Sequence, residues 1–518
     1  MAVTARPATA LLLLAWLAGC GQSAPPAASG AGDGTASGIA SGAGDGAPVA
    51  LPADRPLHPR DVVLIVVDTQ RADRLGCYGF PCDVTPEMDG YARAGVRVAD
   101  VTSQSSWTAP SMVSLMLSRH VADNFVRMPP QPTLAERLRA AGYRTAAFVD
   151  NVLLAPGTGF DRGFDSYAIE PGPKIIVPEM KRDDGRPLFA YFHFVDPHDP
   201  YRPLPSFDIV APEPLPAPMR EALLAAARER RPDADAAALA AEVDAAAAEM
   251  SAARARYAGD VRQADQRVHF VREVLAASGR AADALVVIAA DHGECLWEHR
   301  EAEELLTPEK RASLLTTFKM THNSVLFEEL LAVPLIFSGA GLPAGTVLPG
   351  PAQNVDIVPT ILDLLGLPVP VELQGRSLLP AMLGHAAGAR GGAPQGTTAA
   401  AADAAPDTKA AHAAGTSPVL CANSAVFTSV RDERGWKLIV PWDDTRGDHS
   451  QLFDLRADPG ERHPIALPPQ DGEARAAAER LARAVHDYRA TGLHATRSED
   501  VIDAETRERM EQLGYLGK

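Results

Sequence analysis

Three short stretches of this sequence carry side chains that could together hold a metal ion against a hydroxyl group. Asp68 and the pair Asp291-His292 each follow an apolar run, and Thr108 lies in the polar segment Ser-Trp-Thr-Ala-Pro-Ser. Carboxylates and imidazoles bind divalent metals, and a bound metal makes an alkoxide available at neutral pH. Because a free threonine hydroxyl is not such a nucleophile, the combination predicts a metal-assisted attack on an ester.

The apolar runs before these residues predict strands that are buried on both faces. Such runs, rich in β-branched residues and without alternation, occupy residues 61–67, 188–195, 284–290 and 333–337. The segments between them are long enough for crossover helices, so we expect an α/β sandwich with a mainly parallel central sheet. Chemistry gathers at the carboxyl ends of strands in such sheets, where Asp68, Asp196 and Asp291 would lie.

Helical patterns occupy several of the intervening segments. A helix is expected over Pro110–Leu117, with Thr108 just before its amino terminus, where backbone N–H groups favour an anionic oxygen. A second is expected over 133–141. Residues 218–278 are rich in Ala, Glu and Arg, are broken near Pro232, and predict long exposed helices, of which 218–255 would be an insertion.

Composition predicts one large domain and a smaller one. The chain has 518 residues, of which 46% are hydrophobic and 22% charged, which is ordinary for a globular protein. We expect the catalytic domain at 58–383, a low-complexity loop at 384–418 and a subdomain at 419–518, with short antiparallel strands over 419–466 and a helix over 472–491. The net charge of −17, without a basic cluster, argues against nucleic acid as a partner.

The first residues predict export and a lipid anchor. Residues 1–20 carry an apolar run too short to span a bilayer, ending in Leu-Ala-Gly-Cys, which is typical of a lipoprotein signal peptide with Cys20 as the lipidated residue. An ordinary secretory signal is the alternative. Residues 21–57 are mainly Ala, Gly, Ser and Pro and predict a flexible tether. We therefore expect the cell envelope, facing the periplasm in a Gram-negative cell, with membrane attachment through the lipid only.

Four further cysteines leave the disulfide pairing open. Cys77 and Cys82 are close enough for a small disulfide loop, while Cys295 and Cys421 have no near neighbour in sequence. No Cys-x-x-Cys pair is present, which argues against a thiolate metal site.

Taken together, the motifs resemble the sulfatase family of the alkaline phosphatase superfamily, and the resemblance covers about residues 60–518 apart from the insertions. The motifs are Asp68-Thr69-Gln70-Arg71, Ser106-Trp107-Thr108-Ala109-Pro110-Ser111, Asp196-Pro197-His198-Asp199-Pro200-Tyr201, Asp291-His292-Gly293-Glu294 and His322-Asn323-Ser324. The resemblance implies an alkaline-phosphatase-like α/β sandwich, a metal at the carboxyl edge of its sheet, and a small C-terminal antiparallel subdomain.

Several positions depart from the pattern of that family. Thr108 falls where sulfatases place the Cys or Ser that becomes formylglycine, Thr69 replaces an acid, Met112 replaces an Arg, and His292 replaces an Asn. Threonine is not expected to undergo the conversion, so a direct alkoxide would replace the aldehyde hydrate. The resulting ligand set of Asp68, Thr108, Asp291 and His292 mixes oxygen with imidazole. That mixture favours zinc or manganese, with calcium still open.

A second group of residues is open to two interpretations. Asp196, His198 and His322 are candidates for a second metal or for contacts with substrate oxygens, so one or two ions can be present. With a single metal, His198 becomes the leaving-group acid and His322 an oxyanion contact. His193 is assigned to packing, and Arg71 with Asp73 to an ion pair that braces a loop.

These features predict a metal-dependent hydrolase or transferase of phosphate or sulfate esters that uses Thr108 as its nucleophile. Phosphoesters are favoured, because sulfatases rely on the aldehyde that Thr108 would lack. An ester of envelope or glycan origin would be the substrate. One alternative is a sulfuric ester hydrolase that works with threonine, and another is a catalytically inactive binding or scaffold protein of the envelope.

Overall fold

The computed structural model of the chain describes residues 59–494, apart from 300–321, 389–418, 443–449 and gaps of one or two residues. The expected signal peptide, the lipidated Cys20, the tether and most of the low-complexity loop lie outside the described residues. Within the described part of the chain, no helix combines the length and the apolar character needed to cross a bilayer.

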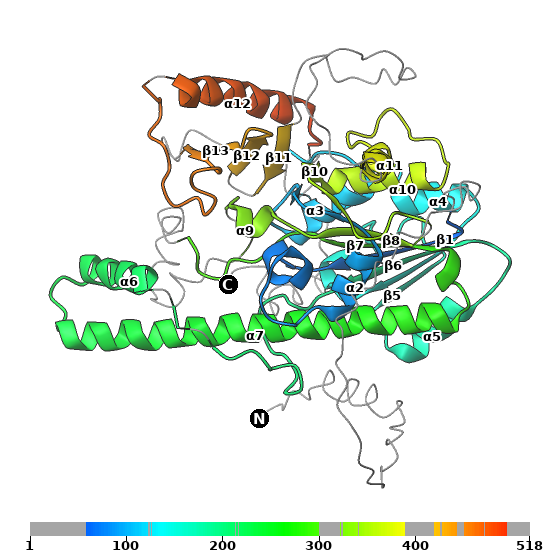
Figure 1. Cartoon of the computed structure of the whole chain (residues 1–518), viewed down its shortest axis with the longest axis horizontal. Coiled ribbons are helices and arrows are strands. Elements are labelled where there is room, and N and C mark those ends of the chain that lie inside the picture. Colours follow the sequence, from blue (N-terminus) through cyan, green and yellow to red (C-terminus); the bar gives the residue numbers. More distant parts are fainter. Residues whose placement is uncertain are drawn as a thin grey trace, which may run out of the picture.

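An eight-stranded sheet forms the centre of the molecule (Figure 1). Its strands, in spatial order, are β5 (Ser166–Ile169), β4 (Arg144–Val149), β6 (Leu188–Phe194), β1 (Asp61–Val67), β7 (Ala284–Ala290), β8 (Leu335–Gly339), β2 (Gly95–Val98) and β9 (Thr346–Leu348). Neighbouring strands are parallel except that β8 runs antiparallel to both β7 and β2. The mainly parallel sheet is therefore confirmed, whereas the run at 333–337 belongs to an antiparallel strand that begins two residues later.

The central strand β1 shows why the sequence runs do not alternate. Its side chains are all buried, and alternate residues enter two separate cores. One core contains Val62, Leu64 and Val66; the other contains Val63, Ile65 and Val67. A strand covered on both faces has no polar side, so it reads as a continuous apolar run.

Helices cover both faces of the sheet (Figure 1). The first core is closed by α3 (Thr108–Leu117), α4 (Leu134–Ala140), α10 (Ile357–Leu364) and α11 (Leu379–Gly388). The second is closed by α2 (Pro86–Ala94), α5 (Pro173–Lys181) and the carboxyl half of α7 (Ala236–Ala277). For α4, the predicted start is confirmed by a capping box in which Thr133 and Glu136 satisfy each other's backbone N–H groups.

The Ala-rich segment folds into a pair of helices that extends beyond the sheet (Figure 1). Here α6 (Ala217–Arg230) packs on the amino half of α7 through Leu223, Leu239 and Val243. The predicted break near Pro232 is confirmed, because α7 begins anew at Asp235, whose carboxylate accepts hydrogen bonds from two backbone N–H groups. The 42 residues of α7 then run without interruption onto the sheet.

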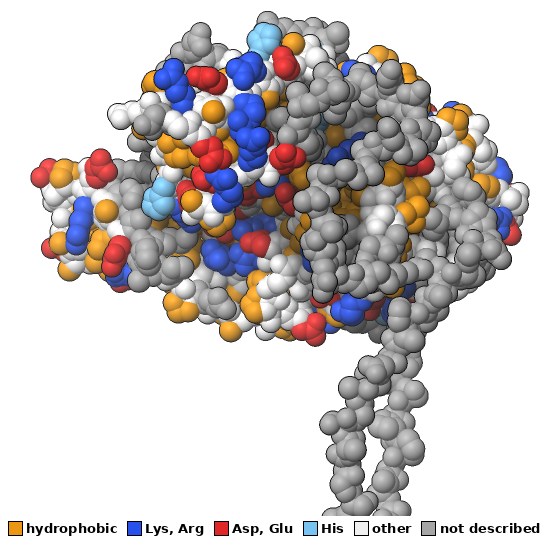
Figure 2. Space-filling model, turned by 45° about the horizontal axis from the view of Figure 1, so that its top comes forward, with side chains coloured by type: hydrophobic (Ala, Val, Ile, Leu, Met, Phe, Trp, Pro, Cys, Tyr) orange, Lys and Arg blue, Asp and Glu red, His pale blue; other side chains and the backbone are white. Residues whose placement is uncertain are grey.

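The C-terminal part forms the predicted antiparallel sheet. It consists of β11 (Val419–Asn423), β12 (Phe427–Asp432), β13 (Trp436–Pro441) and β14 (Gln451–Asp454), covered by α12 (Gly472–Thr491). The short helix α9 (Glu328–Leu331) packs beside it, and β3 (Val101–Thr102) pairs with β10 (Ala352–Gln353). On the face in Figure 2, acidic and basic side chains are mixed. An exposed pair of this kind joins Arg475 and Glu479 on α12.

Cys77 and Cys82 are free thiols, so the Cys77–Cys82 disulfide that the spacing allowed is not formed. The two side chains belong to different apolar clusters. Cys77 packs on the sheet core beside α2, whereas Cys82 packs with Phe80 and Tyr201.

A buried ion-pair network attaches the C-terminal sheet to the catalytic domain. The ammonium group of Lys437, with a side chain only 1% exposed, lies 2.8 Å from both Glu328 and Glu461. Arg431 also pairs with Glu328, at 3.1 Å. Charges removed from water require such partners, so each member of the network depends on the others.

We predict that Lys437→Ala lowers the free energy of unfolding by about 3–5 kcal/mol, because it removes the cation that Glu461 and Glu328 share and leaves Glu328 with Arg431 alone. Chemical denaturation measures the change. The control is Arg475→Ala, which removes an exposed pair and should cost less than about 1 kcal/mol. Equal effects of the two substitutions would contradict the stabilising role of the buried network.

Candidate active site

Asp68 and Asp291 lie side by side at the carboxyl edge of the sheet. Strands β1 and β7 are parallel and in register, with Val67 opposite Ala290, so the next residue of each strand is an aspartate. Both carboxylates are 0% exposed. Asp291 Oδ1 accepts hydrogen bonds from the backbone N–H groups of Thr69, at 3.2 Å, and His292, at 2.8 Å.

The charge of this pair is only partly compensated. Asp68 Oδ2 accepts a hydrogen bond of 2.6 Å from the Asn151 amide, while Asp68 Oδ1 and Asp291 Oδ2 have no hydrogen-bond partner in the described structure. Burial, and next the charge of Asp291, raise the pKa of Asp68 well above its usual range. Among the described residues, the two carboxylates therefore have no Lys or Arg partner that would compensate their charge.

The turn after Asp68 is strained and is held from outside the sheet. Thr69 has φ = 55°, a left-handed conformation that is costly for a β-branched residue. The Tyr257 hydroxyl, from α7, donates to the Thr69 carbonyl at 2.8 Å and accepts from the Arg71 N–H at 3.2 Å. The predicted ion pair between Arg71 and Asp73 is confirmed at 2.7 Å.

Thr108 is the first residue of α3 rather than the residue before it, because Trp107 is the N-cap. Pro110 is tolerated inside the helix since the first turn has no N–H partners to lose. The Thr108 hydroxyl lies 3.3 Å from His292 Nε2. In the same helix, the Ser111 hydroxyl donates to the Asp291 carbonyl at 2.5 Å, which ties α3 to the end of β7.

His292 presents one ring nitrogen to the carboxylates. Its Nδ1 donates to the Gly293 carbonyl at 2.8 Å, which leaves the lone pair on Nε2. Nε2 lies 3.7 Å from Asp68 Oδ1 and 3.5 Å from Asp291 Oδ2. Gly293 permits the chain to pass this close to the backbone of Glu329, since a Cβ at residue 293 would lie 2.0 Å from the Glu329 carbonyl oxygen. Burial lowers the pKa of His292 and so favours the neutral ring.

His193 is not the simple packing residue that the sequence suggested. It belongs to β6, opposite Val66, and its Nε2 lies 3.9 Å from Asp291 Oδ2. The ring is 0% exposed and neither nitrogen has a hydrogen-bond partner in the described structure. Burial lowers the pKa of His193 to about 4. The only signal in the sequence is one imidazole in the otherwise apolar and aromatic strand Leu-Phe-Ala-Tyr-Phe-His-Phe.

A divalent cation fits this group of atoms. Asp68, His193 and Asp291 each offer a ligand atom within 4.8 Å of the others, and these are the buried atoms without hydrogen-bond partners. Two further clusters of potential ligands occur in the described residues, but one acid of each is already paired with a Lys or Arg cation. Glu298 pairs with Arg71 and Glu461 pairs with Lys437, so neither cluster lacks positive charge in the same way.

The structure brings His198 and His322 together but places Asp196 in another interaction. The two imidazole rings are 4.7 Å apart, and His322 lies 4.9 Å from the ring of His292. Asp196 faces Arg267 at 3.4 Å, and Arg267 also pairs with Asp150 at 2.5 Å. Within the described residues, none of the potential ligand clusters contains Asp196.

Glu294 distinguishes the two histidines. Its carboxylate lies 3.1 Å from His322 Nδ1. Burial would lower the pKa of His322, but the charge of Glu294 and this hydrogen bond raise it. Burial, and next the neighbouring His322, lower the pKa of His198 to about 3. His322 is therefore the histidine of the pair that holds a proton more readily.

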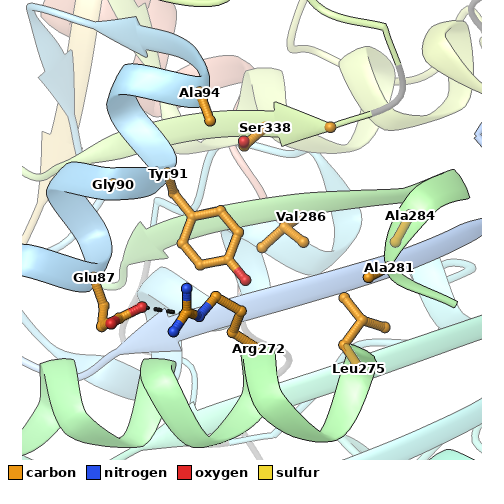
Figure 3. Close-up of a pocket in the computed structure, with 11 residues that line it drawn as sticks. Glu87, Gly90, Tyr91, Ala94, Arg272, Leu275, Ala281, Ala284, Val286 and Ser338 are labelled. Atoms are coloured by element: carbon orange, nitrogen blue, oxygen red, sulfur yellow. Dashed lines mark ion pairs between the residues drawn. The ribbon is translucent and has the colours of Figure 1, made fainter. Parts of the chain in front are cut away.

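A cavity of about 330 Å³ lies at the opposite edge of the sheet (Figure 3). It is lined by Tyr91, Leu275 and Ala284, with the ion pair of Glu87 and Arg272 beside it, at 3.1 Å. Ala284 begins β7, whereas the candidate site follows the last residue of that strand. This cavity is therefore separate from the candidate active site.

Comparison with known proteins identifies the class. The sulfatase family model matches residues 60–367, which is more than half of the chain. The chain therefore belongs to the sulfatase family.

Curated relatives match over parts of their length. Arylsulfatase K of Rattus norvegicus is 34% identical over 96 residues, which cover 18% of this chain and 14% of the relative. The multifunctional alkaline phosphatase superfamily protein PehA of Trinickia caryophylli is 29% identical over 224 residues, covering 39% of this chain and 38% of the relative. The chain thus spans less than half of these relatives.

Solved structures share the fold over most of the chain. The phosphonate monoester hydrolase of Agrobacterium radiobacter has a TM-score of 0.58 at 21% identity, covering 84% of this chain and 96% of that one. A structure bound to its substrate D-glucosamine-2-N,6-O-disulfate has a TM-score of 0.59 at 18% identity, covering 84% and 98%. At these identities the likeness establishes the α/β fold.

We predict that Asn151→Ala weakens binding of Zn²⁺ by about 10- to 100-fold, because the amide that orients the Asp68 carboxylate is lost. Competition with a chromophoric chelator measures the affinity. Gln451→Ala, which removes an amide in the C-terminal sheet, is the control and should leave the affinity unchanged. Wild-type affinity in the Asn151 variant would show that the amide does not orient a metal ligand.

Proposed function

We propose that the chain is a metal-dependent hydrolase or transferase of phosphate or sulfate esters, with Thr108 as nucleophile and phosphoesters preferred. The observation that carries the proposal is the position of the Thr108 hydroxyl. It lies 3.3 Å from His292 Nε2, at the start of α3 and beside the cation-deficient pair of Asp68 and Asp291. Residue 108 is neither Cys nor Ser, so the aldehyde of a typical sulfatase is not expected.

The surrounding residues give the hydroxyl a fixed position. Ser111 and Ser103 both donate to the Asp291 carbonyl, so α3 cannot shift relative to the end of β7 without breaking buried hydrogen bonds. A divalent metal held by Asp68, Asp291 and His292 would lower the pKa of the Thr108 hydroxyl and neutralise charge on the substrate. Zinc or manganese suits this mixture of oxygen and nitrogen donors better than calcium does.

The chemical step follows from these positions. The Thr108 hydroxyl gives its proton to water, its oxygen attacks phosphorus or sulfur in line, a bond to that oxygen forms, and the bond to the leaving alcohol breaks. The leaving oxygen takes a proton from the pair of His198 and His322, whose rings are 4.7 Å apart, or from water. Water, or an acceptor alcohol in a transferase, then cleaves the threonine ester and restores Thr108.

A sulfuric ester hydrolase that works with threonine is the second candidate. Support comes from the curated relatives, which include arylsulfatase K and a Δ4,5-hexuronate-2-O-sulfatase of Bacteroides thetaiotaomicron that is 26% identical over 260 residues. Support for phosphorus comes from PehA and from the fold shared with phosphonate monoester hydrolase. Substrates of envelope or glycan origin fit either candidate.

Thr108→Ala should reduce kcat by at least about a thousandfold while the metal content stays at the wild-type level, because only the nucleophile is lost. Thr108→Ser keeps a hydroxyl and should retain most of the activity. Thr491→Ala on α12 serves as the control for a remote hydroxyl. Full turnover by the alanine variant, or an aldehyde at residue 108 by mass spectrometry, would overturn the assignment.

A substrate panel with metal analysis distinguishes the candidate functions. We expect kcat/KM for a phosphodiester or phosphonate monoester to exceed that for an aryl sulfate by at least about tenfold, which is about 1.4 kcal/mol of transition-state stabilisation. A preference for the sulfate would favour the threonine-type sulfatase. Turnover of none of these esters by the metal-loaded protein would favour a binding or scaffold role.

A further inference from the structure

We propose that His193 is itself a ligand of the metal, so that the site has two imidazoles, His193 and His292, beside the carboxylates of Asp68 and Asp291. The inference rests on the proposed function only in assuming that this site holds a metal. It adds the second-last residue of β6 to a ligand set that the sequence motifs place just after strand ends.

The position of the His193 ring is unusual for a buried imidazole. The ring is 0% exposed, and neither nitrogen has a hydrogen-bond partner in the described structure. Buried polar atoms are nearly always hydrogen-bonded, so such a pair of nitrogens requires an explanation. The Asp291 Oδ2 atom lies 3.9 Å from Nε2, which is too far for a hydrogen bond.

The strand order directs this ring toward the other ligands. His193 lies opposite Val66 in β1, and its neighbours on the same face of β6, Phe189 and Tyr191, enter the core that α3 covers. Asp68 follows β1 by one residue and lies on that same face, since Val66 also enters this core. The ring therefore points to the side of the sheet from which Thr108 approaches.

The separations are within a few tenths of an ångström of those between ligands around one ion. Ligand atoms of a tetrahedral zinc site with bonds of roughly 2.0–2.2 Å lie roughly 3.3–3.6 Å apart. The three measured separations are 3.5 Å from His292 Nε2 to Asp291 Oδ2, 3.7 Å from His292 Nε2 to Asp68 Oδ1, and 3.9 Å from His193 Nε2 to Asp291 Oδ2. Small movements on binding would close these distances.

A second imidazole strengthens the preference of the site for zinc or manganese over calcium. Two nitrogen and two oxygen donors suit zinc or manganese, whereas calcium takes oxygen ligands almost exclusively. His193 also differs from His292 in the hydrogen bonding of its Nδ1 atom. His292 Nδ1 donates to the Gly293 carbonyl, while His193 Nδ1 has no hydrogen-bond partner in the described structure, so its orientation depends more on the metal.

The test counts imidazoles on the bound metal. In wild-type protein loaded with Cu²⁺, pulsed electron paramagnetic resonance should detect two coordinated imidazoles, and one in His193→Phe, which keeps the ring volume but removes both nitrogens. His292→Ala should also retain one. Zn²⁺ affinity of His193→Phe should fall by more than about a hundredfold, beyond the loss caused by an outer-shell partner.

The control is His120→Phe, which replaces a partly buried histidine outside the site, packed edge-on against Tyr488. It should keep two imidazoles and wild-type affinity. Two imidazoles in folded His193→Phe, or none in His292→Ala, would overturn the assignment of His193 while leaving the proposed function intact. Absence of metal from the wild-type protein would instead overturn the metal dependence on which the proposed function rests.

Discussion

The burial of two aspartates beside each other is the constraint on which the rest of this site depends. Parallel pairing of β1 and β7 puts Asp68 and Asp291 at the same level of the sheet, out of contact with water. Removing two like charges from water costs free energy unless positive charge compensates them. The neighbours that the structure describes are backbone N–H groups, the Asn151 amide and imidazoles, and such a set of groups is compatible with a divalent metal between the carboxylates.

The long buried strands of the sheet could be predicted from the sequence, whereas the direction of β8 and the short strands could not. Strands β1 and β7 and helix α12 have the expected bounds, because fully buried strands and an amphipathic terminal helix have distinct patterns. The reversed direction of β8 was missed, since an apolar run carries no information about which way its strand runs. The short strands β2, β4 and β5 were missed as well, because they lack a long β-branched run.

Some residues of the candidate site could likewise be recognised from the sequence, and others could not. Asp68 and Asp291 could be recognised because each ends a predicted strand, and the structure places them together. His193 could not be recognised, because a histidine inside an apolar strand looks like a core residue until its neighbours in space are known. Asn151 reaches Asp68 across 83 residues of sequence, and Asp196 meets Arg267 across 71, separations that no local pattern reveals.

Helix α7 connects a peripheral pair of helices to the strained turn after Asp68 through one side chain, Tyr257. Its amino half packs on α6, whereas its carboxyl half carries Tyr257 and then Val268 on the sheet. Each residue of an α-helix advances the side chains by about 100°. A single-residue insertion between Tyr257 and Val268 would therefore turn the hydroxyl away from Thr69, while changes of length before Met250 would leave that register intact. The carboxyl half of this helix is therefore fixed in register by a turn to which it does not belong, whereas the amino half is not under that constraint.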